Sequence, residues 1–196
     1  MQLSKIVLPV DFSERSKGAV HYAKPLACRF RSEIIVVHVF ETSAMLANIP
    51  EAGVPEGWWE EYRDQTRKQL EAFQADEFHG MRVRHMLLKG DPAKSIVDLA
   101  HSEKADLIVM PTHGYGRFRR FILGSVTAKV LHDTDCPDPR HARREVDDAS
   151  ARLPEVADGL LGGVDQAADV GVEGAGEVGV VDLAHGAYLH AGRVVH

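Results

Sequence analysis

Apolar residues recur along the first 137 positions in two patterns, which alternate along the chain. Four short runs are almost continuously apolar and rich in β-branched residues, as in strands buried on both faces of a sheet. These predicted strands are residues 5–10, 33–39, 83–88 and 106–110. The stretches between them repeat apolar residues at helical spacing. Strands that alternate with helices indicate a parallel sheet covered on both sides, an open, doubly wound α/β fold of the Rossmann-like type.

The predicted helices follow the strands one by one. They run from a cap at Asp11 or Ser13 to Phe30, over about residues 58–78, from Pro92 behind an Asp91 cap through Ala100, and over 125–133. Pro25 lies inside the first of them. Because proline has no N–H to donate, we expect it to kink or locally break that helix.

The composition is that of a globular domain with an appendage. The chain has 196 residues, 27% charged and 44% hydrophobic, and no stretch approaches the roughly 18 apolar residues of a membrane span. Two cysteines are too few for a disulfide framework, and the histidines show no zinc-ligand spacing. No apolar leader follows Met1, so we expect a cytoplasmic protein, and the net charge of −6 argues against a dedicated nucleic-acid binder.

Charge and composition change abruptly after residue 137. Residues 1–137 hold 18 Lys and Arg against 18 Asp and Glu, whereas residues 138–196 hold 5 against 11. Val, Ala, Asp, Glu and Gly, whose codons all begin with G, supply 40 of the last 59 residues. We therefore divide the chain into an α/β domain, 1–137, and an acidic Gly/Ala/Val-rich tail, 138–196, with little regular structure. The tail is either a frameshift product read through GC-rich DNA or a genuine acidic extension.

Ligands of an open parallel sheet bind outside the carboxyl ends of its strands, and three segments fall there. They are Pro9-Val10-Asp11, Val39-Phe40 and Met110 to Ser125. In the last segment Gly124-Ser125 opens a helix, whose free N–H groups and positive dipole end suit a phosphate. Gly114 permits close approach of the backbone to a ligand. A flexible surface loop with an ordinary helix cap is the competing interpretation.

The same segment lacks two familiar phosphate motifs. It has no Gly-Lys-Ser/Thr of a Walker loop, and Arg119 stands where the dinucleotide fingerprint has its third glycine. Asp11 can accept from a ribose hydroxyl or cap the following helix, and the residues leave both roles open. His113 has no evident carboxylate or nucleophile positioned beside it, so we predict no efficient hydrolase.

Five motifs occur in a fixed order along residues 1–137. They are Leu8-Pro9-Val10-Asp11-Phe12-Ser13, Val37-His38-Val39, Gly90-Asp91-Pro92, Gly114 separated by nine residues from Gly124-Ser125-Val126-Thr127, and Cys136-Pro137. In composition and order they resemble the motifs of the universal stress protein family. The resemblance implies an open sheet of order 3-2-1-4-5 and a site for an adenine nucleotide, ATP, with or without Mg²⁺.

The resemblance also implies which residues hold the nucleotide. They are Pro9, Val10, Asp11 and Val39 on the adenosine side, and Met110, Gly114, Gly124, Ser125 and Val126 on the phosphate side. No catalytic or metal-ligating residue is implied. The implied protein is a homodimer of the cytoplasm that senses or sequesters nucleotide during stress, with at most slow ATP hydrolysis.

Two departures from the family pattern change this picture. Pro111 stands where the ATP motif has its first glycine, and proline has no N–H to give to a phosphate. The family continues after Cys136-Pro137 with an apolar fifth strand that commonly pairs two subunits, whereas residues 138–144 here are polar. We therefore expect the order 3-2-1-4, with the fifth strand missing, the flank of the fourth exposed and dimerisation in doubt. The alternative function is a nucleotide-free dimerisation or partner-interaction module of the same fold.

Overall fold

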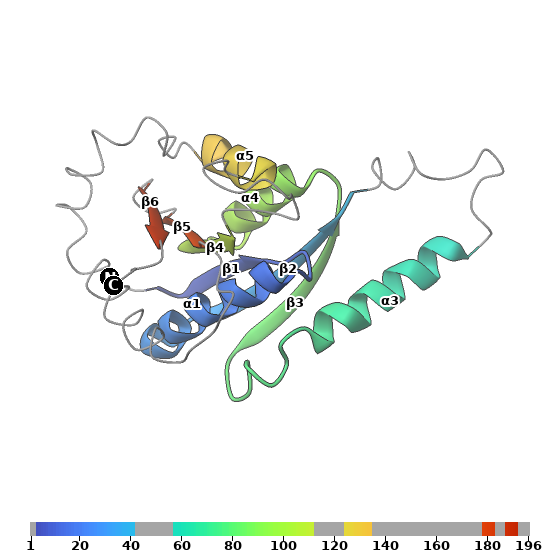
Figure 1. The fold of residues 1–196 in the computed structure, drawn as a ribbon, viewed down its shortest axis with the longest axis horizontal. Coiled ribbons are helices and arrows are strands. Elements are labelled where there is room, and N and C mark those ends of the chain that lie inside the picture. Colours follow the sequence, from blue (N-terminus) through green and yellow to red (C-terminus); the bar gives the residue numbers. More distant parts are fainter. Residues whose placement is uncertain (1–2, 42–56, 112–123, 135–177, 183–186, 192–196) are drawn as a thin grey trace.

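The computed structural model describes residues 3–41, 57–111, 124–134, 178–182 and 187–191. Its elements in chain order are β1 (Lys5–Pro9), α1 (Glu14–Phe30), β2 (Glu33–Phe40), α3 (Trp58–Ala72), β3 (Val83–Lys89), α4 (Pro92–Ser102), β4 (Leu107–Pro111), α5 (Ser125–Asp133), β5 (Val178–Asp182) and β6 (Ala187–Ala191). Figure 1 shows the strands side by side in one sheet, with helices on both of its faces. The predicted α/β, doubly wound fold is confirmed.

Four strands form the parallel part of the sheet, in the predicted order β3-β2-β1-β4. Ile6 of β1 lies between Ile34 of β2 and Leu107 of β4. These central residues are almost completely buried, as are their neighbours Val7 and Ile35. The continuous apolar runs in the sequence follow from this arrangement, because helices cover both faces of the parallel strands.

Alternate residues of each strand enter two separate hydrophobic cores. Leu8 of β1 packs with apolar residues of α1 and α3, whereas Val7 packs with residues of α4 and α5. One face of the sheet is therefore covered by α1 and α3 and the other by α4 and α5 (Figure 1). Each fully buried aliphatic side chain contributes about 1.5–3 kcal/mol, so these cores are the main source of stability.

The helix starts agree with the predicted caps. The side chain of Ser13 accepts a hydrogen bond from the Ser16 N–H at the start of α1, and Asp91 caps α4 in the same way. The helix α1 continues through Pro25 without the expected break. Its buried face, on both sides of the proline, packs against the sheet and holds the helix together.

The helix α3 is shorter than the predicted helix of residues 58–78. It ends at Ala72, and hydrogen-bonded turns follow it. Phe73 and Phe78 lie in these turns and are nevertheless buried in the core beside α1. The apolar spacing therefore predicted burial correctly but placed the helix end too late. Among the helices that the structure describes, none combines the length and apolar character needed to cross a bilayer.

Two strands of the tail extend the sheet. The strand β5 pairs antiparallel with the outer edge of β4, from Leu107 with Asp182 to Pro111 with Val178, and β6 pairs antiparallel with β5. The sequence predicts that the flank of the fourth strand is exposed, and the pairing of β5 with β4 corrects this expectation. Val181 is fully buried in the core beside α4, which gives the pairing an apolar contact. An unpaired strand edge can pair with another chain, and β5 covers this edge of β4.

Charged side chains join three elements at the amino-terminal ends of the strands. Glu103, which follows α4, accepts from Nη1 and Nη2 of Arg84 in β3 at 2.8 and 2.7 Å, and from Nζ of Lys5 in β1 at 2.9 Å. The hydrogen bonds from Arg84 and Lys5 lower the pKa of Glu103 to about 2. A bidentate arginine pair of this kind is among the stronger charged contacts in proteins.

Candidate functional site

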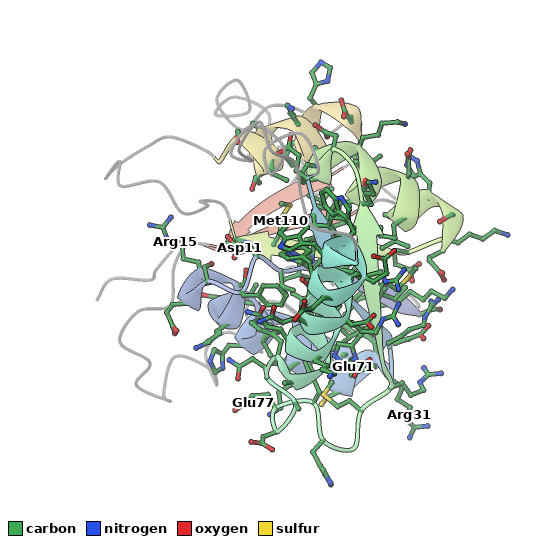
Figure 2. All side chains as sticks on the ribbon, turned by 90° about the vertical axis from the view of Figure 1, so that its right-hand side faces the viewer. Asp11, Arg15, Arg31, Glu71, Glu77 and Met110 are labelled. Atoms are coloured by element: carbon green, nitrogen blue, oxygen red, sulfur yellow. The ribbon has the colours of Figure 1, made fainter. Side chains whose placement is uncertain are left out.

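The strands β1 and β4 are neighbours whose following helices lie on opposite faces of the sheet. The chain passes from β1 into α1 on one face, and the helix that follows β4, α5, packs on the other. The order of the parallel strands reverses at this point, which is where open α/β sheets bind ligands. Because Val7 pairs with Ile108, the residues that follow β1 lie beside the end of β4. Figure 2 shows Asp11 and Met110 close together there.

The Asp11 carboxylate, two residues after β1, is held by the start of α1. Its Oδ1 accepts hydrogen bonds from the Ser13 N–H at 3.0 Å, the Ser13 hydroxyl at 2.5 Å and the Ser16 hydroxyl at 2.5 Å. Burial raises the pKa of Asp11, but the hydrogen bonds from Ser13 and Ser16 together lower it by more, so the pKa lies below its ordinary value. Asp11 is therefore an anion at neutral pH.

The structure separates the two roles that the sequence leaves open for Asp11. The N-cap of α1 is Ser13, whose hydroxyl accepts from the Ser16 N–H at 3.3 Å, and Asp11 supports this turn from outside through Oδ1. None of the hydrogen bonds among the described residues ends on Oδ2. Since residue 11 is also exposed, this second oxygen can accept from a ligand.

His38 of β2 makes a contact that the sequence did not single out. Its Nδ1 lies 2.8 Å from the Val10 carbonyl oxygen, and because a carbonyl only accepts, Nδ1 carries the proton. Burial lowers the pKa of His38, while the bond to Val10 and the charge of Asp11 raise it by less, so the pKa lies below its ordinary value. The ring is therefore neutral at pH 7. The motif Val37-His38-Val39 was visible in the sequence, but the bond depends on where β1 ends beside β2.

Phe12 joins Asp11 to α1 through an unusual backbone conformation. Its φ angle of 61° lies in the left-handed region, which bulky residues rarely adopt. Its ring centroid lies 4.4 Å from that of His38 and 6.0 Å from that of Phe73. Strain of this kind costs about 1–3 kcal/mol and persists only where the surroundings enforce it. The packing on β2 and on the segment after α3 supplies that enforcement.

The start of α5 lies against the end of β4. Thr127, buried in the first turn, donates from Oγ1 to the Pro111 carbonyl at 2.9 Å. Gly124 is the N-cap, with φ −58° and ψ 143°, and offers no side chain to the helix end. The first N–H groups of a helix have no intrahelical partner, and among the described residues no backbone acceptor reaches those of Ser125 and Val126. Such a helix start can bind an anion.

The predicted site residues differ in how far they reach the surface. Pro9, Val10 and Met110 are buried, Val39, Gly124 and Val126 are half-buried, and Asp11 and Ser125 are exposed. Val39, Met110 and Val126 pack in or against the core on the face of α4 and α5. Gly114 and His113 lie outside the described residues. The structure thus brings the segment after β1 and the start of α5 to the same end of the sheet.

The last residue of β4, Pro111, has no N–H, and its carbonyl already accepts from Thr127. Pro111 therefore offers no donor to an anion, whereas the first N–H groups of α5 beside it have no backbone acceptor among the described residues. Within the described ranges, no three His, Cys, Asp or Glu side chains gather as a metal site requires.

Comparison with known proteins agrees with this architecture. The sequence model of the universal stress protein family matches residues 3–138. The universal stress protein MJ0531 of Methanocaldococcus jannaschii is 36% identical over 141 residues, 68% of this chain and 78% of that protein. Rv2005c of Mycobacterium tuberculosis is 28% identical over 190 residues, 86% of this chain and 61% of that protein, so the similarity includes part of the tail. The solved structure of the M. jannaschii protein MJ0577 superposes with a TM-score of 0.53 at 25% identity, over 67% of this chain and 90% of that one. The chain belongs to the universal stress protein family.

Proposed function

We propose that this chain binds an adenine nucleotide, ATP, at the carboxyl ends of β1 and β4, and that it senses or sequesters the nucleotide during stress in the cytoplasm. One observation carries the proposal. The carboxylate of Asp11 and the N–H groups at the start of α5 come to the same end of two neighbouring strands. A nucleotide has hydroxyl donors on its ribose and negative charge on its phosphates, so it matches both groups.

On the adenosine side, Asp11 accepts a hydrogen bond from a ribose hydroxyl through Oδ2. The pKa of this carboxyl lies below its ordinary value, so it remains an acceptor across the physiological pH range. Pro9 and Val10 are buried and contribute through the backbone that carries Asp11. Val39, at the end of the neighbouring strand β2, is half-buried and offers an apolar contact to the adenine.

On the phosphate side, the N–H groups of Ser125 and Val126 and the Ser125 hydroxyl donate to phosphate oxygens. Gly124 has no side chain to obstruct the approach, and Met110 supports this side from the end of β4. Gly114 joins them by family resemblance. When Mg²⁺ accompanies the nucleotide, it is bound mainly by phosphate oxygens and water, as this ion commonly is.

Retention of the nucleotide, rather than rapid turnover, fits the protonation states at this end of the sheet. A general base works best when its pKa lies near the operating pH. The pKa of Asp11 lies below its ordinary value and its Oδ1 is already bonded to Ser13 and Ser16. It is therefore a weak base, and at most slow ATP hydrolysis is expected.

A nucleotide-free interaction module of the same fold is the second candidate, and Pro111 favours it. The residue lacks the N–H that a glycine would offer, and its carbonyl is engaged by Thr127. The family resemblance implies dimerisation through a parallel fifth strand, but β5 already occupies that edge of β4. A homodimer of this chain must therefore use another surface, and light scattering at micromolar concentration tests for it.

Isothermal titration of the whole chain with ATP decides between the two candidates. Adenosine and inorganic triphosphate, titrated separately, report the two halves of the site, and GTP tests recognition of the base. We expect wild-type protein to release heat on ATP addition and Gly124→Val to release none. The variant keeps its fold, because any residue can adopt the φ of −58° that Gly124 has. Gly124→Ala is the graded control, with intermediate affinity. Absence of heat with ATP at high micromolar wild-type protein supports the interaction module, and equal binding by Gly124→Val refutes the proposed site.

A further inference from the structure

Asp11 is held from two sides, and one of them takes no part in the proposed nucleotide contacts. Ser13 and Ser16 bind its Oδ1 from the start of α1. From β2, His38 contacts both residues that flank Asp11. Its Nδ1 donates to the Val10 carbonyl at 2.8 Å, and its ring lies 4.4 Å from the ring of Phe12, between centroids. One side chain therefore attaches the backbone before and after Asp11 to the neighbouring strand.

We infer that His38 is a positioning residue that fixes the turn from Val10 to Ser13 and thereby sets where the Asp11 carboxylate meets the ribose. The consequence for the ribose rests on the proposed nucleotide site. The restraint on Asp11 itself is a property of the chain without any ligand.

The backbone of Phe12 explains why such a restraint is needed. Its φ of 61° is unfavourable for a bulky residue, so the turn relaxes unless contacts hold it. The rings of His38 and Phe73 provide these contacts. Relaxation at Phe12 alters the path between Asp11 and Ser13, and so the bonds that fix the carboxylate. His38 contacts the residue on each side of Asp11, Val10 through Nδ1 and Phe12 through its ring.

The surroundings of His38 are mostly uncharged. Phe12, whose ring lies against that of His38, packs in turn on Phe73, and Leu87 is the partner of His38 on β3. Asp11 is the charged residue whose field acts on the ring. Two titratable groups lie on this face of β3, His85 two residues before Leu87 and Lys89 two residues after it. The charge of Glu71 in α3 acts on His85, and Nζ of Lys89 lies 5.8 Å from the centroid of the Trp59 ring. A neutral His38 with its proton on Nδ1 is the form that the Val10 bond requires.

Two variants separate the donor from the ring. His38→Asn keeps an N–H at the position of Nδ1, because both nitrogens are bonded to Cγ, but it removes the ring. His38→Phe keeps a ring for Phe12 but removes the donor. His85→Phe is the matched control, since it replaces a histidine on the same face that contacts neither Val10 nor Phe12 among the described residues.

The first measurement uses no nucleotide. The carboxyl carbon of Asp11 is titrated by NMR in each protein, and the ring nitrogens of His38 are observed in the wild type. We expect a proton on Nδ1 in the wild type, and an Asp11 pKa below its ordinary value in the wild type and in His85→Phe. The same holds for His38→Asn, because it keeps the donor to Val10 and the ring of Phe73 still packs on Phe12. In His38→Phe the Asp11 pKa moves toward its ordinary value. The second measurement is ATP titration, in which His38→Phe binds about tenfold more weakly, the factor for one lost hydrogen bond of ordinary strength, and His38→Asn stays within about threefold of wild type.

A proton on Nε2 in place of Nδ1 in the wild type overturns the inference without any variant. An Asp11 titration in His38→Phe that equals wild type also overturns it. If His38→Phe does not fold, His38→Asn decides, because an Asp11 pKa that departs from wild type there contradicts the role of the donor. If wild-type protein shows no ATP binding, the proposed function fails, while the Asp11 titrations still decide whether His38 positions the carboxylate.

Discussion

The Ser125→Pro substitution removes the N–H and the hydroxyl of residue 125 from the proposed phosphate site and leaves the helix in place. Ser125 is the first residue of α5, where proline is favoured because the N–H it lacks has no intrahelical partner. The residue before a proline prefers an extended conformation, and Gly124 already has φ −58° and ψ 143°. The first intrahelical bond, from the Ala128 N–H to the Gly124 carbonyl at 2.8 Å, is unaffected.

The expected effect on binding is large compared with the effect on folding. A hydrogen bond to a charged group is worth about 1.5–3 kcal/mol, so loss of the N–H alone lowers ATP affinity by roughly 10- to 150-fold. The free energy of unfolding changes by no more than about 0.5 kcal/mol, as for other substitutions that remove no contact. Calorimetric titration with ATP at one fixed salt concentration measures the first quantity, and urea denaturation measures the second.

Ser125→Ala is the matched control, because it removes the hydroxyl and keeps the N–H. It loses the hydrogen bond from the hydroxyl but keeps that from the N–H, whereas Ser125→Pro loses both, so Ser125→Ala binds ATP more tightly. Equal affinity of the two variants shows that the N–H makes no contact with the nucleotide. The phosphate side of the proposed site is then wrong, even if ATP binds elsewhere on the chain.

Three further predictions concern the domain itself. Thr127→Val leaves the Pro111 carbonyl without its 2.9 Å donor, so urea denaturation shows a loss of about 1–3 kcal/mol, and no loss contradicts the contact between α5 and β4. Ile108→Ala empties a fully buried position in the core beside α4 and costs about 2–5 kcal/mol in the same assay, whereas a smaller cost means that the core repacks. Folding lowers the pKa of Glu103 from 4.5 to about 2, so Glu103 stabilises the folded chain above pH 4.5. This stabilisation is lost as the pH falls toward 2, because the unfolded chain binds the proton more readily in that window. Acid unfolding of Glu103→Gln is therefore less steep between these values, and an unchanged profile refutes the role of the ion pair with Arg84.

The parallel part of the fold was predictable because burial on both faces leaves a direct trace in the sequence. The strands β1, β2 and β4 are nearly continuous apolar runs, and Ser13 and Asp91 mark the helix starts where the structure has them. The end of α3 was not predictable in the same way. The apolar residue Phe73 continues the helical spacing and is buried, but it is buried from a turn. Periodicity reports which side chains face the core and says less about where the helical hydrogen bonds stop.

The sequence of the antiparallel strand β5 has no pattern from which the strand could be predicted. Its five residues include Gly179, and their composition resembles that of other Val- and Gly-containing stretches of the tail sequence. Val181 of this strand pairs with Ile108 and is buried in the same core, a contact between distant parts of the chain. Local composition cannot reveal such a contact, because it depends on an edge that exists only after the first four strands have paired.

The candidate site shows the same division between local and distant causes. Asp11 and Gly124-Ser125 were found because strand ends and helix starts can be located from the local sequence. The bond between His38 and Val10 could not be found in that way, since it joins the ends of two strands whose register is set by pairing over Lys5 to Pro9. Family resemblance marked the motif that contains His38 without indicating what the ring does.

The two halves of the proposed site are held by different contacts, and this bears on how the nucleotide can act. Asp11 is fixed by Ser13, Ser16 and His38, all on the side of α1 and β2. The start of α5 is fixed by Thr127 on β4. Among the described residues, no hydrogen bond or ion pair joins these two groups directly, although β1 and β4 are paired. A molecule that binds both halves therefore adds a connection across the end of the sheet that the chain alone lacks. Binding at one half makes binding at the other an intramolecular event, which favours a ligand with a sugar and phosphates over either part alone.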